Sequence, residues 1–360
     1  MDIIIHRGTH QIGGCVTEIR TDFASIIIDM GAPLPGSLPE ETTEDVEDIV
    51  SACRKCDAVF ITHYHGDHIG RIDWLNPDTP LYIGKAAKEI YGTYCETVNE
   101  NEKLKRLQNA YTYVHGQPVT IKDITVTPLR TSHSALDSYM LLIEADGSTV
   151  LHTGDFSLHG YEGNRWLKEL TETISEEISV PIEYLICEGT MLPDRVRTSP
   201  TELDVINQIT TLMKKYKKVF VLCSSTHIDR IAEFYHHRNY HAPLVSDKYQ
   251  NILLQYVTNV YGKTDPFYQL QYAYAYSINN PKLLAIMEKY GFVALIRPNA
   301  RSRRFLQRYY DDKDSAIVYS MWSGYLKDGP AKNEYLCDFL KPYKITAFIH
   351  ASGHALPEEI

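Results

Sequence analysis

A dense cluster of potential metal ligands follows an apolar run early in the sequence and marks the end of a strand. The run AVFIT ends at Thr62, and HYHGDHIG follows it, with His63, His65, Asp67 and His68. On a strand the first two histidines would face the same side, and the turn after them can return the other two groups to the same point. Imidazole nitrogens and carboxylate oxygens bind catalytic zinc and similar ions. Buried neutral histidines are the alternative, but four polar groups beside an apolar strand would each need a partner.

Length and charge narrow the class of protein. The chain has 360 residues, 44% of them hydrophobic, and a formal net charge of -10. A chain of this length is expected to form two lobes or one domain with a large insertion. The acidic balance argues against binding nucleic acid or an anionic membrane by bulk charge, although a local basic patch stays open. No apolar run is long enough for a signal-peptide core or a membrane span, so we expect a cytoplasmic protein with no membrane partner.

The cysteines indicate reduced thiols. Seven cysteines, an odd number, are scattered through the chain, which does not suit a disulfide framework. The only CxxC pair is Cys53 and Cys56. It could belong to a zinc or redox site, or it could simply end a helix. Because no second pair accompanies it, the sequence favours the helix end.

Two patterns divide the chain. Up to about residue 190, short strands and turns dominate, with helices expected over residues 43–54 and 85–109. From about residue 200, strands and helices alternate, which is typical of parallel βαβ units. No repeat or low-complexity linker separates the two parts. We therefore expect a second domain that is inserted into the first.

Further polar residues lie in short motifs, most of them at the ends of apolar runs. These are Asp29 in IIIDMG, His133 in TSHSALDS, His152 and Asp155 in LHTGDF, Glu188 in ICEGT, and His350, Ser352, Gly353 and His354 in HASGHA. A strand-end aspartate such as Asp29 often only accepts hydrogen bonds from turn amides. His152 reads as a core histidine. Taken singly, the motifs leave the function open.

Their order along the chain resembles the metallo-β-lactamase fold superfamily. The motifs THYHGDHIG, IIIDMG, TSHSALDS and HTGDF carry that resemblance, and with HRGTHQIGG and HASGHA the chain most resembles ribonuclease J and its relatives in the β-CASP group of nucleases. The resemblance implies an α/β (α+β) fold, an αββα sandwich interrupted by a β-CASP-like α/β domain. Residues 1–195 would form the first part of the sandwich, 196–325 the inserted domain, and 326–360 a truncated return to the sandwich.

The resemblance also implies a centre with two divalent metal ions, Zn²⁺ or alternatively Mn²⁺. One ion would be held by His63, His65 and His133, the second by Asp67 and His68, with Asp155 between them. Two such ions lower the pKa of a shared water, so that hydroxide is available near neutral pH. Asp29 would support the site through hydrogen bonds without being a ligand. The family pattern continues to a further histidine, motif C, which this sequence lacks, so we expect the second metal to be one ligand short.

The remaining implied residues act on the substrate. Glu188 in motif A and His354 in motif B would be hydrogen-bonded, so that the imidazolium protonates the leaving oxygen as a general acid. His350, Ser352 and the backbone amide of Gly353 would grip a phosphate. Asp67 is expected to take part in catalysis as well as in metal binding.

Two other stretches could contact a polyanion. Ser224, Ser225 and Thr226 precede a helix whose N-terminus could face a phosphate, although N-capping explains the hydroxyls equally well. The run NARSRRFLQRYY carries Arg301, Arg303, Arg304 and Arg308. It could guide a polyanion toward the metals, or it could be a solvated helix face beside the acids of DDKD.

The predicted function is metal-dependent hydrolysis of a phosphodiester, with RNA or another single-stranded nucleic acid as the partner. A hydrolase of a small ester, thioester or lactam is one alternative, but a small substrate does not require so large an inserted domain. A non-catalytic RNA-binding scaffold is another, although its HxHxDH motif would be expected to have lost ligands. The choices between RNA and DNA, between exonuclease and endonuclease, and between monomer and homodimer stay open.

Overall fold

The computed structural model describes residues 1–37, 39–163, 166, 181–192 and 200–360. Contacts between Cα atoms divide the chain into two compact units, Met1–Val196 with Gly353–Ile360, and Arg197–Ser352. The expected boundary between residues 195 and 196 lies outside the described residues. The second boundary differs from the expectation, because residues 326–352 group with the second unit. Strand β17 (Ala347–Phe348) pairs with β16 (Ser315–Ser320) there.

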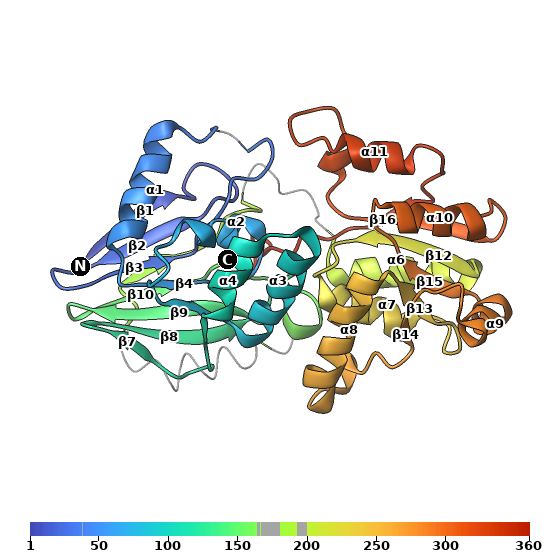
Figure 1. Ribbon diagram of the computed structural model, residues 1–360, viewed down its shortest axis with the longest axis horizontal. Helices are drawn as coiled ribbons and strands as arrows, with labels where there is room; N and C mark the ends of the chain where they lie inside the picture. Colours follow the sequence, from blue (N-terminus) through green and yellow to red (C-terminus); the bar gives the residue numbers. More distant parts are fainter. Residues whose placement is uncertain (38, 164–165, 167–180, 193–199) are drawn as a thin grey trace. The chain divides into compact units, whose positions relative to one another are not determined.

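The first unit contains two sheets (Figure 1). The six-stranded sheet has the order β1 (Asp2–Arg7), β2 (Val16–Arg20), β3 (Ser25–Ile28), β4 (Ala58–Phe60), β5 (Leu81–Ile83) and β6 (Tyr111–Thr112). The five-stranded sheet has the order β11 (Tyr184–Ile186), β10 (Ser148–His152), β9 (Ser138–Ala145), β8 (Ile124–Thr131) and β7 (Val119–Ile121). Hairpins build most of both sheets, while β3, β4, β5 and β6 run parallel to one another.

The main core of this unit lies between the two sheets. Phe60 of β4 packs in the same buried cluster as Leu141 and Ile143 of β9. Because side chains alternate along a strand, Met140 and Leu142 point to the other face of β9, where they meet Ala355 in a second buried cluster. Burying each large apolar side chain stabilises the fold by roughly 1.5–3 kcal/mol. Strand β9 is therefore covered on both faces, and the C-terminal segment helps to cover the outer one.

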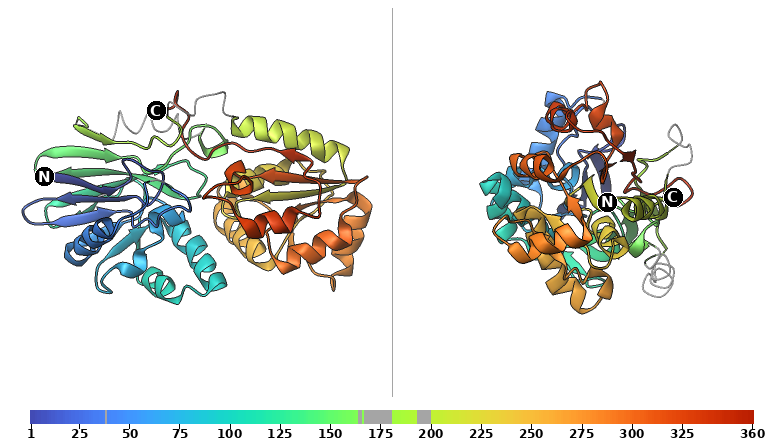
Figure 2. Two further views of the ribbon diagram at one scale, coloured as in Figure 1. Left: turned by 90° about the horizontal axis from the view of Figure 1, so that it is seen from above. Right: turned by 90° about the vertical axis from the view of Figure 1, so that its right-hand side faces the viewer.

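Helices cover the outer face of the first sheet, as the blue to cyan helices of Figure 2 show. They are α1 (Thr43–Lys55), α2 (Gly66–Ile69), η1 (Ile72–Trp74), α3 (Lys85–Val98) and α4 (Asn101–Gln108). The expectation of one helix over residues 85–109 is wrong. Asn99 ends α3 in the left-handed conformation, with φ 63°, and α4 starts anew after Glu100. Asparagine tolerates that conformation better than most residues do.

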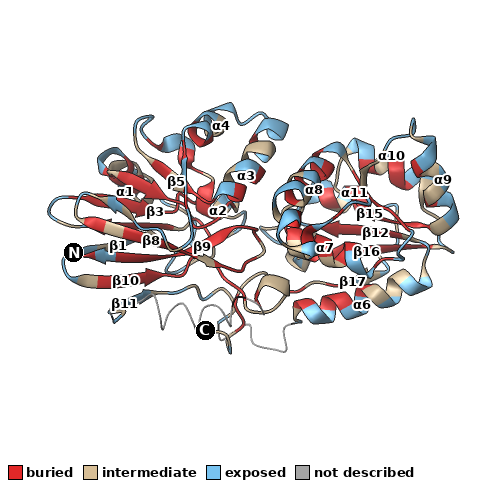
Figure 3. Cartoon of the chain, turned by 90° about the horizontal axis from the view of Figure 1, so that it is seen from below, coloured by how far each residue is buried: buried red, intermediate tan, exposed pale blue. Residues whose placement is uncertain are grey.

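The second unit is built on one parallel sheet. Its order is β14 (Ala273–Ala275), β13 (Leu244–Ser246), β15 (Phe292–Leu295), β12 (Lys218–Cys223), β16 and β17, and every pair in it is parallel. The central strands are buried on both faces (Figure 3), which explains apolar runs such as VFVLC. The prediction of parallel βαβ units is confirmed.

Helices cover both faces of this sheet. In the order of the chain, the helices of the unit are α6 (Glu202–Lys215), α7 (Ile228–His237), α8 (Lys248–Val260), η3 (Tyr261–Lys263), η4 (Pro266–Tyr268), α9 (Pro281–Tyr290), α10 (Ala300–Tyr309), η5 (Ser323–Leu326) and α11 (Glu334–Leu340). The last three α-helices share a buried cluster with Phe220 and Leu222 of β12. Within the described part of the chain, no helix combines the length and the apolar character needed to cross a membrane.

Candidate metal centre

Strands from both sheets of the first unit end at the same place. His63 follows β4 of the first sheet, while His133 and Asp155 follow β8 and β10 of the second. His65 is the N-cap of α2, a single helical turn that carries His68 back toward β4. The backbone N–H of Ala32 donates to the carbonyl of Gly66, which ties this turn to the loop after β3. Residues that are far apart in the sequence are brought together in this way.

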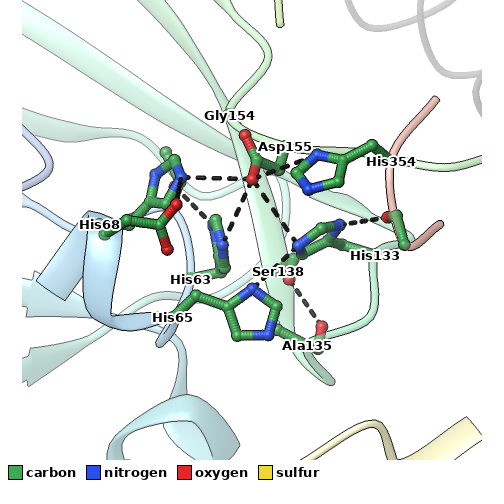
Figure 4. A network of polar contacts seen from close by, with 12 residues as sticks. His63, His65, His68, His133, Ala135, Ser138, Gly154, Asp155 and His354 are labelled. Atoms are coloured by element: carbon green, nitrogen blue, oxygen red, sulfur yellow. Dashed lines mark hydrogen bonds and ion pairs between the residues drawn. The ribbon is translucent and has the colours of Figure 1, made fainter. Parts of the chain in front are cut away.

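The imidazoles converge on one carboxylate oxygen (Figure 4). From Asp155 Oδ2, the distances are 3.2 Å to His68 Nε2, 3.5 Å to His354 Nδ1, and 3.8 Å to both His63 Nε2 and His133 Nε2. Three groups of ligand atoms each lie within 4.8 Å of one another: His63, His65 and His133; His63, His68 and Asp155; and His133, Asp155 and His354. His65 Nδ1 is 3.1 Å from His133 Nε2, close to the spacing of about 3.3 Å that two ligands of a tetrahedral zinc would show.

Hydrogen bonds fix the ring protons of three of these histidines on Nδ1. His68 Nδ1 is 2.7 Å from Asp29 Oδ2, and His133 Nδ1 is 2.6 Å from the carbonyl oxygen of Gly353. Both oxygens can only accept, so each Nδ1 must donate. His63 Nδ1 lies 3.1 Å from Thr62 Oγ1, which donates its own proton to Asp29 Oδ2. The lone pairs on Nε2 of His63, His68 and His133 therefore face the centre.

The charges around the centre suit a divalent cation. Burial holds the pKa of His63 and of His133 well below the usual value and lowers that of His65 to about 4, so these rings are neutral. Burial opposes the ionisation of Asp155, but His68 and His354 hold the pKa of its carboxyl well below the usual range. His63 Nε2 is buried and has no hydrogen-bond partner among the described residues. Buried polar atoms of this kind need an explanation, and a bound metal supplies one.

Asp29 supports the site from behind. Its buried carboxylate accepts hydrogen bonds from the backbone N–H and the hydroxyl of Thr62, at 2.7 and 2.8 Å, as well as from His68. Its backbone has φ 61°, a left-handed conformation that Asp and Asn tolerate. One residue therefore orients both His63, through Thr62, and His68.

Replacing Asp29 by asparagine should weaken metal binding while the chain stays folded. The asparagine would keep the backbone conformation and part of the hydrogen bonding, but it would remove the charge that orients His68. We expect the affinity for Zn²⁺ to fall by about tenfold to a hundred-fold, the usual effect of losing such a supporting group. Competition with a chromophoric chelator measures this. Unchanged affinity in a variant with normal circular dichroism would contradict the assignment.

Asp67 lies at the edge of the cluster. Its Oδ2 is 3.9 Å from His68 Nε2, and the converging ligand groups of the described residues do not include it. Two glycines make room for it. A Cβ atom on Gly13, which has φ +77°, would lie 2.8 Å from Asp67 Cβ, and one on Gly31 would lie 1.8 Å from the Asp67 carbonyl oxygen. The glycines of HRGTHQIGG and IIIDMG thus have a packing reason. The role of Asp67 in metal binding and catalysis stays a prediction.

Glu188 and His354 form a pair beside the metal-ligand cluster. His354 Nδ1 is 2.9 Å from Glu188 Oε2, and Glu188 Oε1 accepts from the backbone N–H of Phe156 at 2.8 Å. Burial lowers the pKa of His354, but Asp155 and Glu188 outweigh that effect and raise it to about 9. His354 therefore carries a proton at neutral pH. The expected hydrogen bond between the two residues is present, while their catalytic role stays a prediction.

Comparisons with known proteins bear on this arrangement. A family model described as the β-lactamase superfamily domain matches residues 26–195. The chain is 27% identical to ribonuclease J of Helicobacter pylori over 161 residues, 42% of this chain and 22% of that protein. It is 25% identical to ribonuclease J of Corynebacterium glutamicum over 223 residues, 60% of this chain and 30% of that protein.

The chain is a ribonuclease J-like protein of the metallo-β-lactamase fold. The matched segments span less than a third of both ribonuclease J proteins. A crystal structure of a protein of unknown function from Enterococcus faecalis V583 shares the fold, with a TM-score of 0.70, 18% identity, and coverage of 99% of this chain and 89% of that one. The fold class and the family resemblance predicted from the sequence are confirmed.

The three residues expected to grip a phosphate do not lie in one unit of this ribonuclease J-like chain. His350 and Ser352 belong to the second unit, and Gly353 belongs to the first. The carbonyl of Gly353 orients His133, and a Cβ atom there would lie 2.3 Å from Ser134 Oγ. His350 Nδ1 lies 3.0 Å from Nη1 of Arg230 and must accept, because arginine only donates. Their roles toward a phosphate stay predictions.

Arg230 joins α6, α7 and the segment after β17. Its buried guanidinium forms a two-pronged ion pair with Glu202 and donates to the carbonyl oxygen of Ala351 at 2.8 Å. Burial and Arg230 together lower the pKa of His350 to about 3, so this ring stays neutral.

Replacing Arg230 by methionine should destabilise the chain. The change would leave the Glu202 carboxylate buried without its partner, which costs about 3–5 kcal/mol. Urea unfolding followed by circular dichroism gives the free energy of unfolding. The double variant Arg230→Met with Glu202→Gln should recover part of the loss. A single variant as stable as the parent chain would show that the ion pair does not stabilise the unit.

Several functional contacts have weak or no sequence signals. Thr62, which relays between Asp29 and His63, is the first residue of THYHGDHIG and could have been flagged by its place beside the first ligand. His152 is a buried histidine, as expected, and its Nδ1 accepts from the N–H of Gly154 in the turn before Asp155. Cys53 and Cys56 are buried at the end of α1, and burial raises the pKa of both thiols to about 12. They do not belong to any ligand cluster of the described residues.

Proposed function

We propose that this chain is a metal-dependent nuclease that hydrolyses phosphodiester bonds in RNA. The observation that carries the proposal is the protonated imidazole of His354 beside a set of neutral imidazoles and one ionised carboxylate. A metal site alone would serve many hydrolases. A proton donor held within 3.5 Å of Asp155 adds what the departing alkoxide of a phosphodiester requires. The ribonuclease J relatives support RNA as the substrate.

His63, His65 and His133 would hold one ion, and Asp67 and His68 a second, with Asp155 between them. Divalent ions such as Zn²⁺ or Mn²⁺ would supply a nucleophilic hydroxide near neutral pH and neutralise phosphate oxygens. The protein orients the ligands through Asp29, Thr62 and Gly353. Glu188 keeps His354 protonated and fixes its ring, so that Nε2 is free to donate to the leaving oxygen. This division of labour is an acid catalyst next to a metal site.

A panel of labelled oligonucleotides tests the proposal. RNA and DNA of one sequence, each with a 5′-phosphate or a 5′-hydroxyl, are incubated with the chain and with added Zn²⁺ or Mn²⁺. We expect metal-dependent cleavage of single-stranded RNA that a chelator abolishes. Hydrolysis of a thioester or lactam without nucleic-acid cleavage would overturn the proposal in favour of a small-molecule hydrolase. RNA binding without cleavage by the metal-loaded protein would overturn it in favour of a scaffold. A cytoplasmic location and a homodimer stay predictions.

A further inference from the structure

Helix α10 of the second unit exposes an unbalanced positive face. Its sequence, ARSRRFLQRY, contains four arginines and no acidic residue. Phe305 and Leu306 anchor the inner side in the buried cluster of the sheet. Arg301, Arg304 and Arg308 are exposed, and their spacing of three and four residues places them in one row on the helix. Because the inner side is buried, the direction of this row is fixed.

The row is unfavourable for the helix itself. The helix macrodipole favours acids in the first turn, yet Arg301 lies there and no acid accompanies it. Arg301 and Arg304, and then Arg304 and Arg308, are like charges at the spacings where side chains meet. Within the described part of the chain, no carboxylate forms an ion pair with any of the three. Local electrostatic rules that are broken without compensation mark a surface that serves something other than folding.

Neighbouring charged groups are engaged elsewhere. Arg297, just before the helix, pairs with Asp247, and Arg303 lies over the ring of Phe339 at 5.4 Å. The acids that follow α10 are also engaged: Asp311 pairs with Lys218, Asp312 accepts from the hydroxyl of Tyr310, and Asp314 accepts from the backbone N–H of Lys217. They are not the counter-ions of the row. The interpretation of α10 as a salt-bridged, solvated helix face therefore loses its basis.

We propose that Arg301, Arg304 and Arg308, the α10 arginine row, dock the phosphate backbone of a single-stranded RNA. The inference rests on the proposed function for the choice of polyanion. Along the helix axis the three Cα positions are spaced by about 4.5 and 6 Å, so the guanidinium groups can meet successive phosphates of one strand. Guanidinium binds phosphate through two parallel hydrogen bonds, which makes arginine better suited than lysine. The contact is independent of base sequence, and in a chain of net charge -10 it gives a polyanion a defined point of approach.

The test compares two triple variants with the same change in charge. The first is Arg301→Gln, Arg304→Gln and Arg308→Gln. The control is Arg54→Gln, Lys55→Gln and Lys214→Gln, which removes three exposed cations from α1 and α6. Both carry Asp155→Asn as well, so that binding is measured without cleavage. Fluorescence anisotropy with a labelled 20-nucleotide oligouridine gives the affinity at several salt concentrations, and thermal melting confirms folding.

Each lost phosphate contact should make the plot of log affinity against log salt shallower by about 0.7. The arginine-row variant should therefore lose about 2 in slope and at least tenfold in affinity at low salt, while the control changes by less than threefold. An unchanged slope in the arginine-row variant would overturn the proposal. Equal losses in both variants would also overturn it, because they would show a response to bulk charge. So would an equal fall in affinity for polyglutamate, which would indicate an acidic protein partner.

The outcome is separable from that of the proposed function. If the parent chain does not cleave RNA but the slopes differ as expected, the docking row stands and the nuclease proposal fails. If the parent chain cleaves RNA and the slopes agree, the nuclease proposal stands and the row fails.

Discussion

Asp155→Asn should reduce the cleavage of RNA by about a thousand-fold and leave the chain folded. Asp155 Oδ2 is the atom on which four imidazoles converge, at 3.2 to 3.8 Å. Asparagine has nearly the same shape but no charge, so it cannot balance a cation or the protonated rings of His68 and His354. Losing metal-based stabilisation of the transition state, worth about 4 kcal/mol, gives a loss of this size.

The experiment needs two readouts and a matched control. Initial rates on a labelled RNA give kcat/KM, and metal analysis of the purified variant gives the number of bound ions. Asp73→Asn, an exposed aspartate of η1 in the same unit, should leave both unchanged. An Asp155→Asn variant with normal metal content and kcat/KM within threefold of the parent value would remove Asp155 from the site.

The second large effect is expected for Glu188→Gln. The glutamine keeps the shape of the side chain and can still accept from His354 Nδ1, but the charge that helps to raise the pKa of His354 to about 9 is lost. If His354 is the general acid, kcat on RNA should fall by about a hundred-fold, the lower end of the usual contribution of acid catalysis. Metal content should not change, because Glu188 is outside the converging ligand groups.

A substrate that needs no acid separates this role from a structural one. Bis(p-nitrophenyl) phosphate releases a stable nitrophenolate, so Glu188→Gln should hydrolyse it at close to the parent rate. Glu183→Gln, an exposed glutamate just before β11, is the control and should behave like the parent chain on both substrates. Equal losses on RNA and on the nitrophenyl ester would show that Glu188 acts on the metal site or the fold, and the assignment of His354 as the acid would fail.

The sequence predicted the ligands well because their signal is local. His63, His65 and His68 stand within one short motif, and the ends of neighbouring strands meet at one edge of a sheet, so His133 and Asp155 could be expected nearby. The fold class followed from strand and helix patterns that differ between the two halves of the chain. These features depend on spacing and apolar runs, which are visible in one sequence.

Contacts between distant residues could not be predicted in the same way. His133 donates to the carbonyl of Gly353, 220 positions away, and a backbone carbonyl leaves no trace in residue type. His350 read as a phosphate contact because of its motif, but Arg230 lies against it from α7, 120 positions away. The break between α3 and α4 depends on one backbone angle at Asn99, which helix propensity does not report. Register and backbone conformation decide these details.

The most direct test of the account is the metal content of the purified chain. Inductively coupled plasma mass spectrometry on the parent chain and on His63→Ala should find at least one equivalent of zinc or manganese in the parent chain and less than about a tenth of that in the variant. Both samples are first dialysed against metal-free buffer. Parent chain that stays free of transition metal after incubation with Zn²⁺ and Mn²⁺, while its circular dichroism shows it folded, would contradict the account.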